Sequence, residues 1–194
     1  MVSGGYTLAR SENDTDGAFS VPATGTYASE WGPSSGDVRH RASLSLFSSA
    51  VKNLSVMIVV SASSGTPYTI RTGYDDNGDG IFNDRPAGVG RNTARATGIW
   101  NSYGNFSYTI GIGKKKIAGG TGFAVSGGPA GMTVTSMNMG DQSRYRLSLN
   151  LSVQNLANHA NYVGYSGTMT STFFLKPTMV EGVRTMNVSV GFTF

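Results

Sequence analysis

Apolar and polar residues alternate along six segments of the chain, which is the pattern of β-strands with two different faces. In the clearest segment, 144–154, tyrosine, leucine and valine occupy the odd positions, and arginine, serine, asparagine and glutamine occupy the even ones. The last segment, 185–194, alternates in the same way. The other segments are 6–9, which is weak, 38–47, 54–60 and 105–112. The sequence therefore predicts an all-β chain of antiparallel strands.

The connections between these segments are very unequal in length, and this favours a membrane barrel over a soluble β-sandwich. Strands of a sandwich also alternate, but soluble domains rarely contain structureless loops beyond about 15 residues. Here the connection 49–53 is short, whereas 61–100 and 156–182 are long and rich in glycine, asparagine, threonine and tyrosine. Outer-membrane barrels combine short periplasmic turns with long extracellular loops. We therefore expect transmembrane strands, with 61–100 and 156–182 outside the cell.

One connection does not fit this scheme. Segment 117–142 is long where a short turn is expected, so it is either a flexible insert or a further hairpin. Six strands are also fewer than the roughly eight that close a lipid-facing barrel. Since an open sheet edge in lipid leaves backbone groups unpaired, we expect either strands upstream of Met1 or the additional hairpin.

Composition narrows the classes of protein that fit. The chain has 27 glycines, 13% charged residues and no cysteine, which excludes disulfides and thiolate metal sites. No stretch approaches the roughly 18 apolar residues of a spanning helix, and the first ten residues do not form a signal peptide. The net charge is +4, but the only basic triplet is 114–116, which is typical of a solvated turn. We expect no nucleic-acid partner.

The chain ends on an aromatic residue within an alternating strand. Phe194 follows Phe192 and Val190 on the same face. This ending resembles the C-terminal signal that the barrel-assembly machinery of outer membranes reads. We therefore expect that machinery to be a partner through Phe194.

Short motifs rich in glycine, asparagine, aspartate and arginine lie in and beside the predicted loops. They are Glu30-Trp31-Gly32-Pro33, Asp37-Val38-Arg39-His40-Arg41, Ser64-Gly65-Thr66-Pro67-Tyr68-Thr69-Ile70, Asp76-Asn77-Gly78-Asp79-Gly80, Asn83-Asp84-Arg85-Pro86, Gly88-Val89-Gly90-Arg91-Asn92, Gln154-Asn155-Leu156-Ala157-Asn158-His159 and Asn161-Tyr162. Together, from Glu30 to Phe194, they resemble the C-terminal barrel region of Oar-like TonB-dependent receptors.

The resemblance implies that residues 1–194 are the C-terminal segment of a large, plugged outer-membrane barrel of the 22-stranded type. It implies location in the cell outer membrane of a Gram-negative type bacterium, contact with outer-membrane lipid, and ligand uptake. An N-terminal plug, further strands and the contact with a TonB-type energy-coupling protein would all precede Met1. The alternative is a structural or adhesion barrel without transport activity, and the presence of an upstream plug domain would distinguish the two.

A candidate metal site lies within the first long loop. Asp75, Asn77 and Asp79 occupy alternate positions before Gly80, as in the first half of a calcium loop. The glutamate expected at the twelfth position is replaced by Pro86, so Asp84 would have to serve as the late carboxylate. The alternative is a turn closed by its own side chains. The sequence predicts one of these two arrangements for Asp75, Asn77, Asp79 and Asp84.

The remaining candidate for chemistry is His40, three residues after Asp37. A catalytic arrangement would also need an activated serine, and no Gly-x-Ser-x-Gly motif marks one. We therefore expect no enzymatic activity, with His40 pointing outward near the membrane rim and His159 serving as a structural loop residue. Four arginines fall on inward positions, where they contact plug carboxylates or are solvated: Arg39, Arg41, Arg144 and Arg146.

Overall fold

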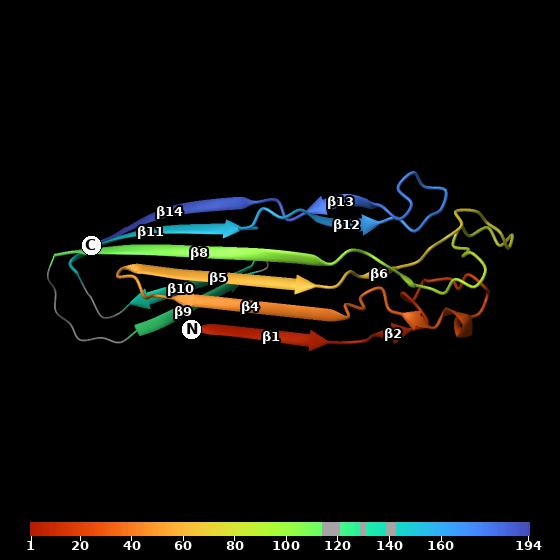
Figure 1. Cartoon of the computed structure of the whole chain (residues 1–194), viewed down its shortest axis with the longest axis horizontal. Coiled ribbons are helices and arrows are strands. Elements are labelled where there is room, and N and C mark those ends of the chain that lie inside the picture. The colour runs from red at the N-terminus through yellow and green to blue at the C-terminus, as the bar shows by residue number, and fades with distance from the viewer. Residues whose placement is uncertain (114–120, 129–130, 139–142) are drawn as a thin grey trace.

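The computed structural model is all-β and is built around one antiparallel sheet, in which each of six strands pairs with the next one along the chain (Figure 1). It describes residues 1–113, 121–128, 131–138 and 143–194. The six strands confirm the six predicted segments. They are β1 (Val2–Leu8), β4 (His40–Ser48), β5 (Leu54–Ser63), β8 (Ile99–Ile112), β11 (Tyr145–Gln154) and β14 (Thr185–Thr193). The sheet is open, with β1 and β14 at its edges.

The register of the sheet aligns the apolar positions of neighbouring strands. Leu46 faces Val2 on one side and Ile58 on the other. Leu149 lies opposite Tyr108 and also opposite Val190. Because directly opposite residues share a face, the alternation predicted within each strand becomes one apolar face and one polar face across the whole sheet.

The connections divide between two ends of the sheet (Figure 1). The β4–β5 turn, the end of β8, the start of β11 and the C-terminus lie at one end, which we call the turn end. Three long loops, 9–39, 64–98 and 155–184, lie at the opposite end, the loop end. The sequence predicts this separation, because connections between successive antiparallel strands alternate between the two ends of a sheet, which places 61–100 and 156–182 at the end opposite to 49–53.

The long loops contain short elements of their own. These are β2 (Glu12–Asn13), a 3-10 helix η1 (Tyr27–Glu30), β3 (Gly32–Pro33), β6 (Pro67–Tyr68), β7 (Ala94–Arg95), β12 (Asn161–Tyr165) and β13 (Pro177–Glu181). In loop 155–184, β12 and β13 form a hairpin that continues beyond the sheet. The loops are therefore more ordered than their composition predicts.

Segment 117–142 contains a hairpin, which confirms one of its two interpretations. Strand β9 (Thr121–Gly128) pairs with β10 (Gly131–Asn138) as a separate two-stranded sheet. This hairpin does not extend the six-stranded sheet, so it does not provide additional strands for a barrel wall.

Burial is concentrated in the loops rather than on the sheet. Among the described residues, Ala23 and Val153 are the only hydrophobic residues that are fully buried. The buried polar and charged residues are Glu30, Asp37, Asp84, Arg91, Asn92, Ser102, Asn155 and Asn161, all at the loop end. Within the part of the chain that the structure describes, no helix has the length and apolarity needed to cross a membrane.

Candidate functional site: a two-faced sheet with a polar loop cap

The apolar face of the sheet is left uncovered by the described part of the chain. Its side chains include Leu44 on β4, Leu149 on β11 and Val188 and Val190 on β14, with exposed fractions of 52%, 45%, 67% and 67%. Monomeric soluble proteins rarely leave so large a contiguous apolar surface open to water. The face is thus an unusually apolar surface for a chain in water.

Aromatic side chains gather at both ends of the apolar face. At the turn end, the ring of Phe192 stacks on Tyr145, with centroids 6.0 Å apart, and lies 6.3 Å from that of Phe194. At the loop end, Tyr6 and Trp100 lie in one row across the strands, joined by Ala42 and Ala62. Aromatic girdles of this kind flank the lipid-facing band of outer-membrane barrels.

The polar face carries serine, threonine, asparagine and glutamine at most positions, and the six strands contain no aspartate or glutamate. Arg41 and Arg146 are on this face, as predicted, because Arg41 lies opposite Thr7 and Arg146 lies opposite Thr193. Arg144 precedes β11, and its guanidinium lies over the ring of Tyr145, 5.4 Å from the centroid, so its inward position stays a prediction. A cation over an aromatic face is stabilised by the ring quadrupole.

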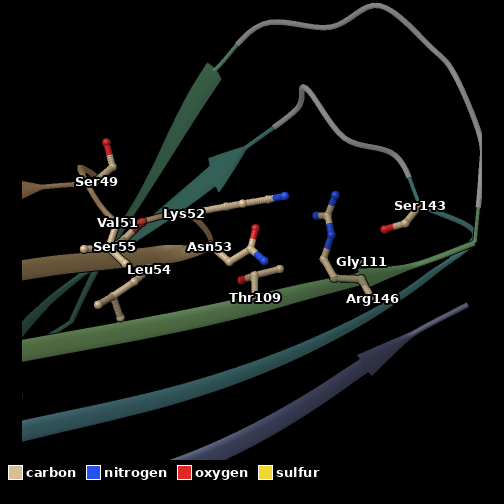
Figure 2. A pocket seen from close by; sticks show the side chains of 10 residues that line it. All are labelled: Ser49, Val51, Lys52, Asn53, Leu54, Ser55, Thr109, Gly111, Ser143 and Arg146. Carbon is tan, nitrogen blue, oxygen red and sulfur yellow. The ribbon is translucent and has the colours of Figure 1, made fainter.

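A cationic pocket of about 310 Å³ lies on the polar face near the turn end. Figure 2 shows Lys52, from the β4–β5 turn, and Arg146, from β11, projecting to the same side of the sheet, with Ser143 beside Arg146. The described residues that line this pocket include no acidic side chain. It marks the turn end of the polar face as positively charged.

At the loop end, buried charges join loops 9–39 and 64–98. Arg85 donates two hydrogen bonds to the Glu30 carboxylate, 2.5 and 2.8 Å long. The buried Arg91 donates to the Glu30 carbonyl, to the Asp16 carboxylate and to Asn13. Since an unpaired buried charge is costly, these bonds hold the loops together. We call the three long loops together the loop cap.

Asp37 anchors the loop cap to the start of β4. It is 1% exposed and accepts hydrogen bonds from the Arg95 guanidinium and from the Ser11 amide. Arg39 lies 3.6 Å from the same carboxylate. One carboxylate thus contacts both ends of loop 9–39 and the far end of loop 64–98.

The pKa values of the two buried carboxyl groups, Glu30 and Asp37, are both lowered, but burial and hydrogen bonding contribute differently to each. Burial alone would raise the pKa of Glu30, but the hydrogen bonds from Arg85, its charge and the Ala23 amide outweigh it and hold the pKa below its ordinary value. For Asp37, the hydrogen bond from Arg95 is the largest cause of its lowered pKa, and it outweighs burial. Both groups are therefore charged at neutral pH.

Loop 155–184 contacts strand β8 and loop 64–98 through side chains of β12 and of the segment before it. The Asn161 amide donates to the carbonyl of Trp100 and to Asn101, and Tyr165 stacks on Tyr68 with centroids 5.9 Å apart. His159 packs against Trp100 at 4.8 Å, which agrees with its predicted structural role. All three long loops thus form one connected body.

The four predicted calcium ligands meet in one turn. The Asp75 carboxylate accepts bonds from the amides of Gly78, Asp79 and Gly80. The Asp84 carboxylate accepts bonds from the two amides at 76 and 77. The described residues contain no group of three or more histidine or acidic side chains placed to hold a metal ion. Calcium binding at Asp75, Asn77, Asp79 and Asp84 stays a prediction.

His40 is on the apolar face, and its Nδ1 lies 2.7 Å from the hydroxyl of Tyr6. It does not pair with Asp37, whose carboxylate bonds to Arg95 and Ser11. Sequence analysis did not single out Glu30, Arg85, Arg91 and Arg95 as individual residues. The first three could have been found from the short loop motifs of the sequence, because Glu30 lies in 30–33, Arg85 in 83–86 and Arg91 in 88–92.

The comparisons with known proteins add nothing to this geometry. No protein-family model, curated protein or solved structure matches the chain. The features of the chain that bear on function are its two faces, the aromatic ends of the apolar face and the loop cap.

Proposed function

We propose that this chain is the C-terminal part of an Oar-like TonB-dependent receptor barrel in a bacterial outer membrane, where it takes part in ligand uptake and has no catalytic role. The observation that carries the proposal is the uncovered apolar face that runs across all six antiparallel strands. In lipid that face is solvated by acyl chains, whereas in water it would drive aggregation.

The dimensions of the sheet support membrane insertion. The strands β4, β5, β11 and β14 have 9, 10, 10 and 9 residues, close to the roughly 9–11 that a tilted strand needs to cross a bilayer. The two open edges, β1 and β14, expose backbone groups that must be paired in hydrocarbon. The proposal therefore includes further strands of the same barrel beside both edges.

The separation of loops and turns supports an orientation. Outer-membrane barrels place long loops outside the cell and short turns in the periplasm. The loop cap then faces the outside, and the turn end with Lys52, Arg146 and Phe194 faces the periplasm. Phe194 is available there to the barrel-assembly machinery, and the polar face borders the plug.

The second candidate is a structural or adhesion barrel, and the connected loop cap favours it as much as it favours ligand uptake. The two functions differ in energy coupling. Uptake by cells that carry the complete gene should stop when the TonB-type protein is deleted, while adhesion should be unaffected.

Membrane integration is tested first by fractionation of cells that express the complete gene. The proposal predicts recovery in the detergent-extracted outer membrane. Recovery in the soluble periplasmic fraction would contradict it.

A further inference from the structure

The polar face contains a patch that breaks its pattern. Four neighbouring positions carry large apolar or aromatic side chains: Phe47 on β4, which lies opposite Met57, Met57 and Val59 on β5, and Tyr103 on β8. Val59 and Tyr103 lie directly opposite each other, and Gln154 on β11 lies opposite Tyr103 on its other side. The β5 residues of this patch lie in the continuous apolar run 56–60, which interrupts the alternation of β5.

A cavity of about 510 Å³ opens over this patch at the loop end of the polar face. Val183, which is 80% exposed, lines it from loop 155–184. The remaining lining includes Ser61, Asn101 and Gln154. An apolar floor with a few polar groups at its rim is the usual composition of a small-molecule site.

The rim has hydrogen-bonding groups to offer. Among the described residues, neither the Gln154 amide nor the Ser61 hydroxyl has a side-chain hydrogen-bond partner. Asn101 accepts one bond at its Oδ1, from the Asn161 amide at 3.0 Å. Amide and hydroxyl groups at these positions can both donate to and accept from a ligand.

Among the residues that the structure describes, no charged side chain lines the cavity. Arg184, next to Val183 in the chain, directs its guanidinium to the carbonyls of Asn155 and Leu156. A charged ligand would therefore lose its hydration without gaining a counter-charge, which is unfavourable.

We propose that this cavity, with Met57, Val59 and Tyr103 as its floor and Ser61, Asn101 and Gln154 at its rim, binds an uncharged molecule that has a flat apolar ring and amide or hydroxyl groups. The inference rests on the proposed function only in taking the polar face as the water-filled side of a membrane sheet. In that setting the cavity is a binding station on the barrel wall, just below the loop cap.

The test uses three probes of similar shape and different charge. N-acetyltryptophanamide is neutral, N-acetyltryptophan carries a carboxylate, and tryptamine carries an ammonium group. Their dissociation constants are measured by isothermal titration calorimetry on the product of the complete gene, folded in lipid nanodiscs. The neutral probe should bind at least about tenfold more tightly than either charged one, because only the charged probes pay an uncompensated desolvation cost.

A matched pair of variants locates the site. Val59→Asp introduces a carboxylate into the cavity, and Asn150→Asp introduces one on the same face of the sheet, outside the cavity lining. Val59→Asp should weaken binding of the neutral probe by about tenfold or more, and Asn150→Asp should change it by less than about twofold. If Val59→Asp does not fold, Tyr103→Leu replaces it, with a weakening of at least about threefold expected from loss of the ring contact.

Equal binding of the three probes, equal effects of the two variants, or no saturable binding by folded wild-type protein would each overturn the inference. Membrane insertion is scored in the same samples by heat-modifiable migration. A chain that inserts but binds no probe contradicts this site alone. A chain that folds without lipid and still binds the neutral probe contradicts the proposed function and leaves the site standing.

Discussion

Glu30 is a charged side chain that the loop cap holds almost entirely out of water, and its carboxylate accepts hydrogen bonds from the Arg85 guanidinium and the Ala23 amide. Removing one partner of a buried ion pair leaves the other charge uncompensated. Glu30→Gln should therefore weaken the closed loop cap by about 3–5 kcal/mol. Hydrogen exchange of amides in 11–37 measures this change, because local opening exposes them.

The control for this variant is Glu181→Gln, which removes an exposed carboxylate from loop 155–184. Amides in 11–37 should exchange at the wild-type rate in that protein. Similar acceleration in both variants would show that Glu30 has no special role in closing the cap.

The pH dependence of the loop cap follows from its two carboxyls. The pKa values of Glu30 and Asp37 are lowered on folding, so both stabilise the cap above the ordinary carboxyl pKa values. That stabilisation is lost as the pH falls through the lowered values. The protection factor of amides in 11–37, which is the exchange rate corrected for its intrinsic pH dependence, should therefore be constant from neutral pH down to about pH 5 and fall below about pH 4. A fall in protection between pH 7 and pH 6 would contradict this assignment.

Calcium binding at the turn around Asp75 is a further prediction at this scale. The missing twelfth-position glutamate favours weak binding, with a dissociation constant of about 10⁻⁴–10⁻³ M. Calorimetric titration should show this binding in wild type and in Asp76→Ala, and its loss in the Asp75→Ala, Asp79→Ala double variant. Equal binding by wild type and the double variant, or none at millimolar calcium, would leave only a turn closed by its own side chains.

Much of the residue-scale picture lay beyond sequence reasoning. Period-two alternation is a local pattern, so it assigns Leu149 and Asn150 to opposite faces directly. The partners of Arg91 are more than 60 positions away in the chain, at Glu30, Asp16 and Asn13. No local pattern specifies which distant loop a buried arginine will reach.

At the scale of elements, β11 offers a sharp test of the two faces. Leu149 points to the apolar face and Asn150 to the polar face. A lysine on the lipid face near mid-membrane costs about 2–4 kcal/mol, whereas one on the inner face is tolerated. Leu149→Lys should thus lower the free energy of unfolding in lipid vesicles by that amount, and Asn150→Lys should have little effect. Equal destabilisation would argue against a lipid face.

Strand β14 carries a second prediction at this scale. Phe194 is 92% exposed beside Phe192 at the turn end, so its ring is available to an assembly factor. Deleting Phe194 from the complete gene should lower the yield of folded protein in the outer membrane. Phe194→Tyr keeps the aromatic ring and should preserve the yield. Unchanged yield after the deletion would exclude a signal role.

The elements also show where alternation fails as a guide. Strands such as β11 were predictable because each has one apolar and one polar face. The β9–β10 hairpin remained one of two alternatives, since glycine is frequent in 117–142 and weakens the alternation. In β12 and β13 the pattern is short, and their pairing depends on loop contacts such as that of Thr178 with Gly164.

In the whole molecule, the buried polar contacts lie in the loops, and the exposed apolar surface lies on the sheet. The loop cap is held by buried ion pairs and hydrogen bonds, while the sheet exposes its apolar face and has almost no buried hydrophobic residue among those described. A soluble sandwich would reverse this, with a second layer over the apolar face. The medium around the apolar face therefore distinguishes a membrane barrel from a soluble sandwich.

The most direct test maps the surroundings of β11 residue by residue. The chain has no cysteine, so single cysteines can be placed at each position from 147 to 152 and spin-labelled in lipid-reconstituted protein. We predict that labels at 147, 149 and 151 are accessible to oxygen, which concentrates in lipid, and labels at 148, 150 and 152 to a water-soluble nickel complex. If the odd positions are accessible to the nickel complex, or to neither reagent, the apolar face is not in lipid and the account is wrong.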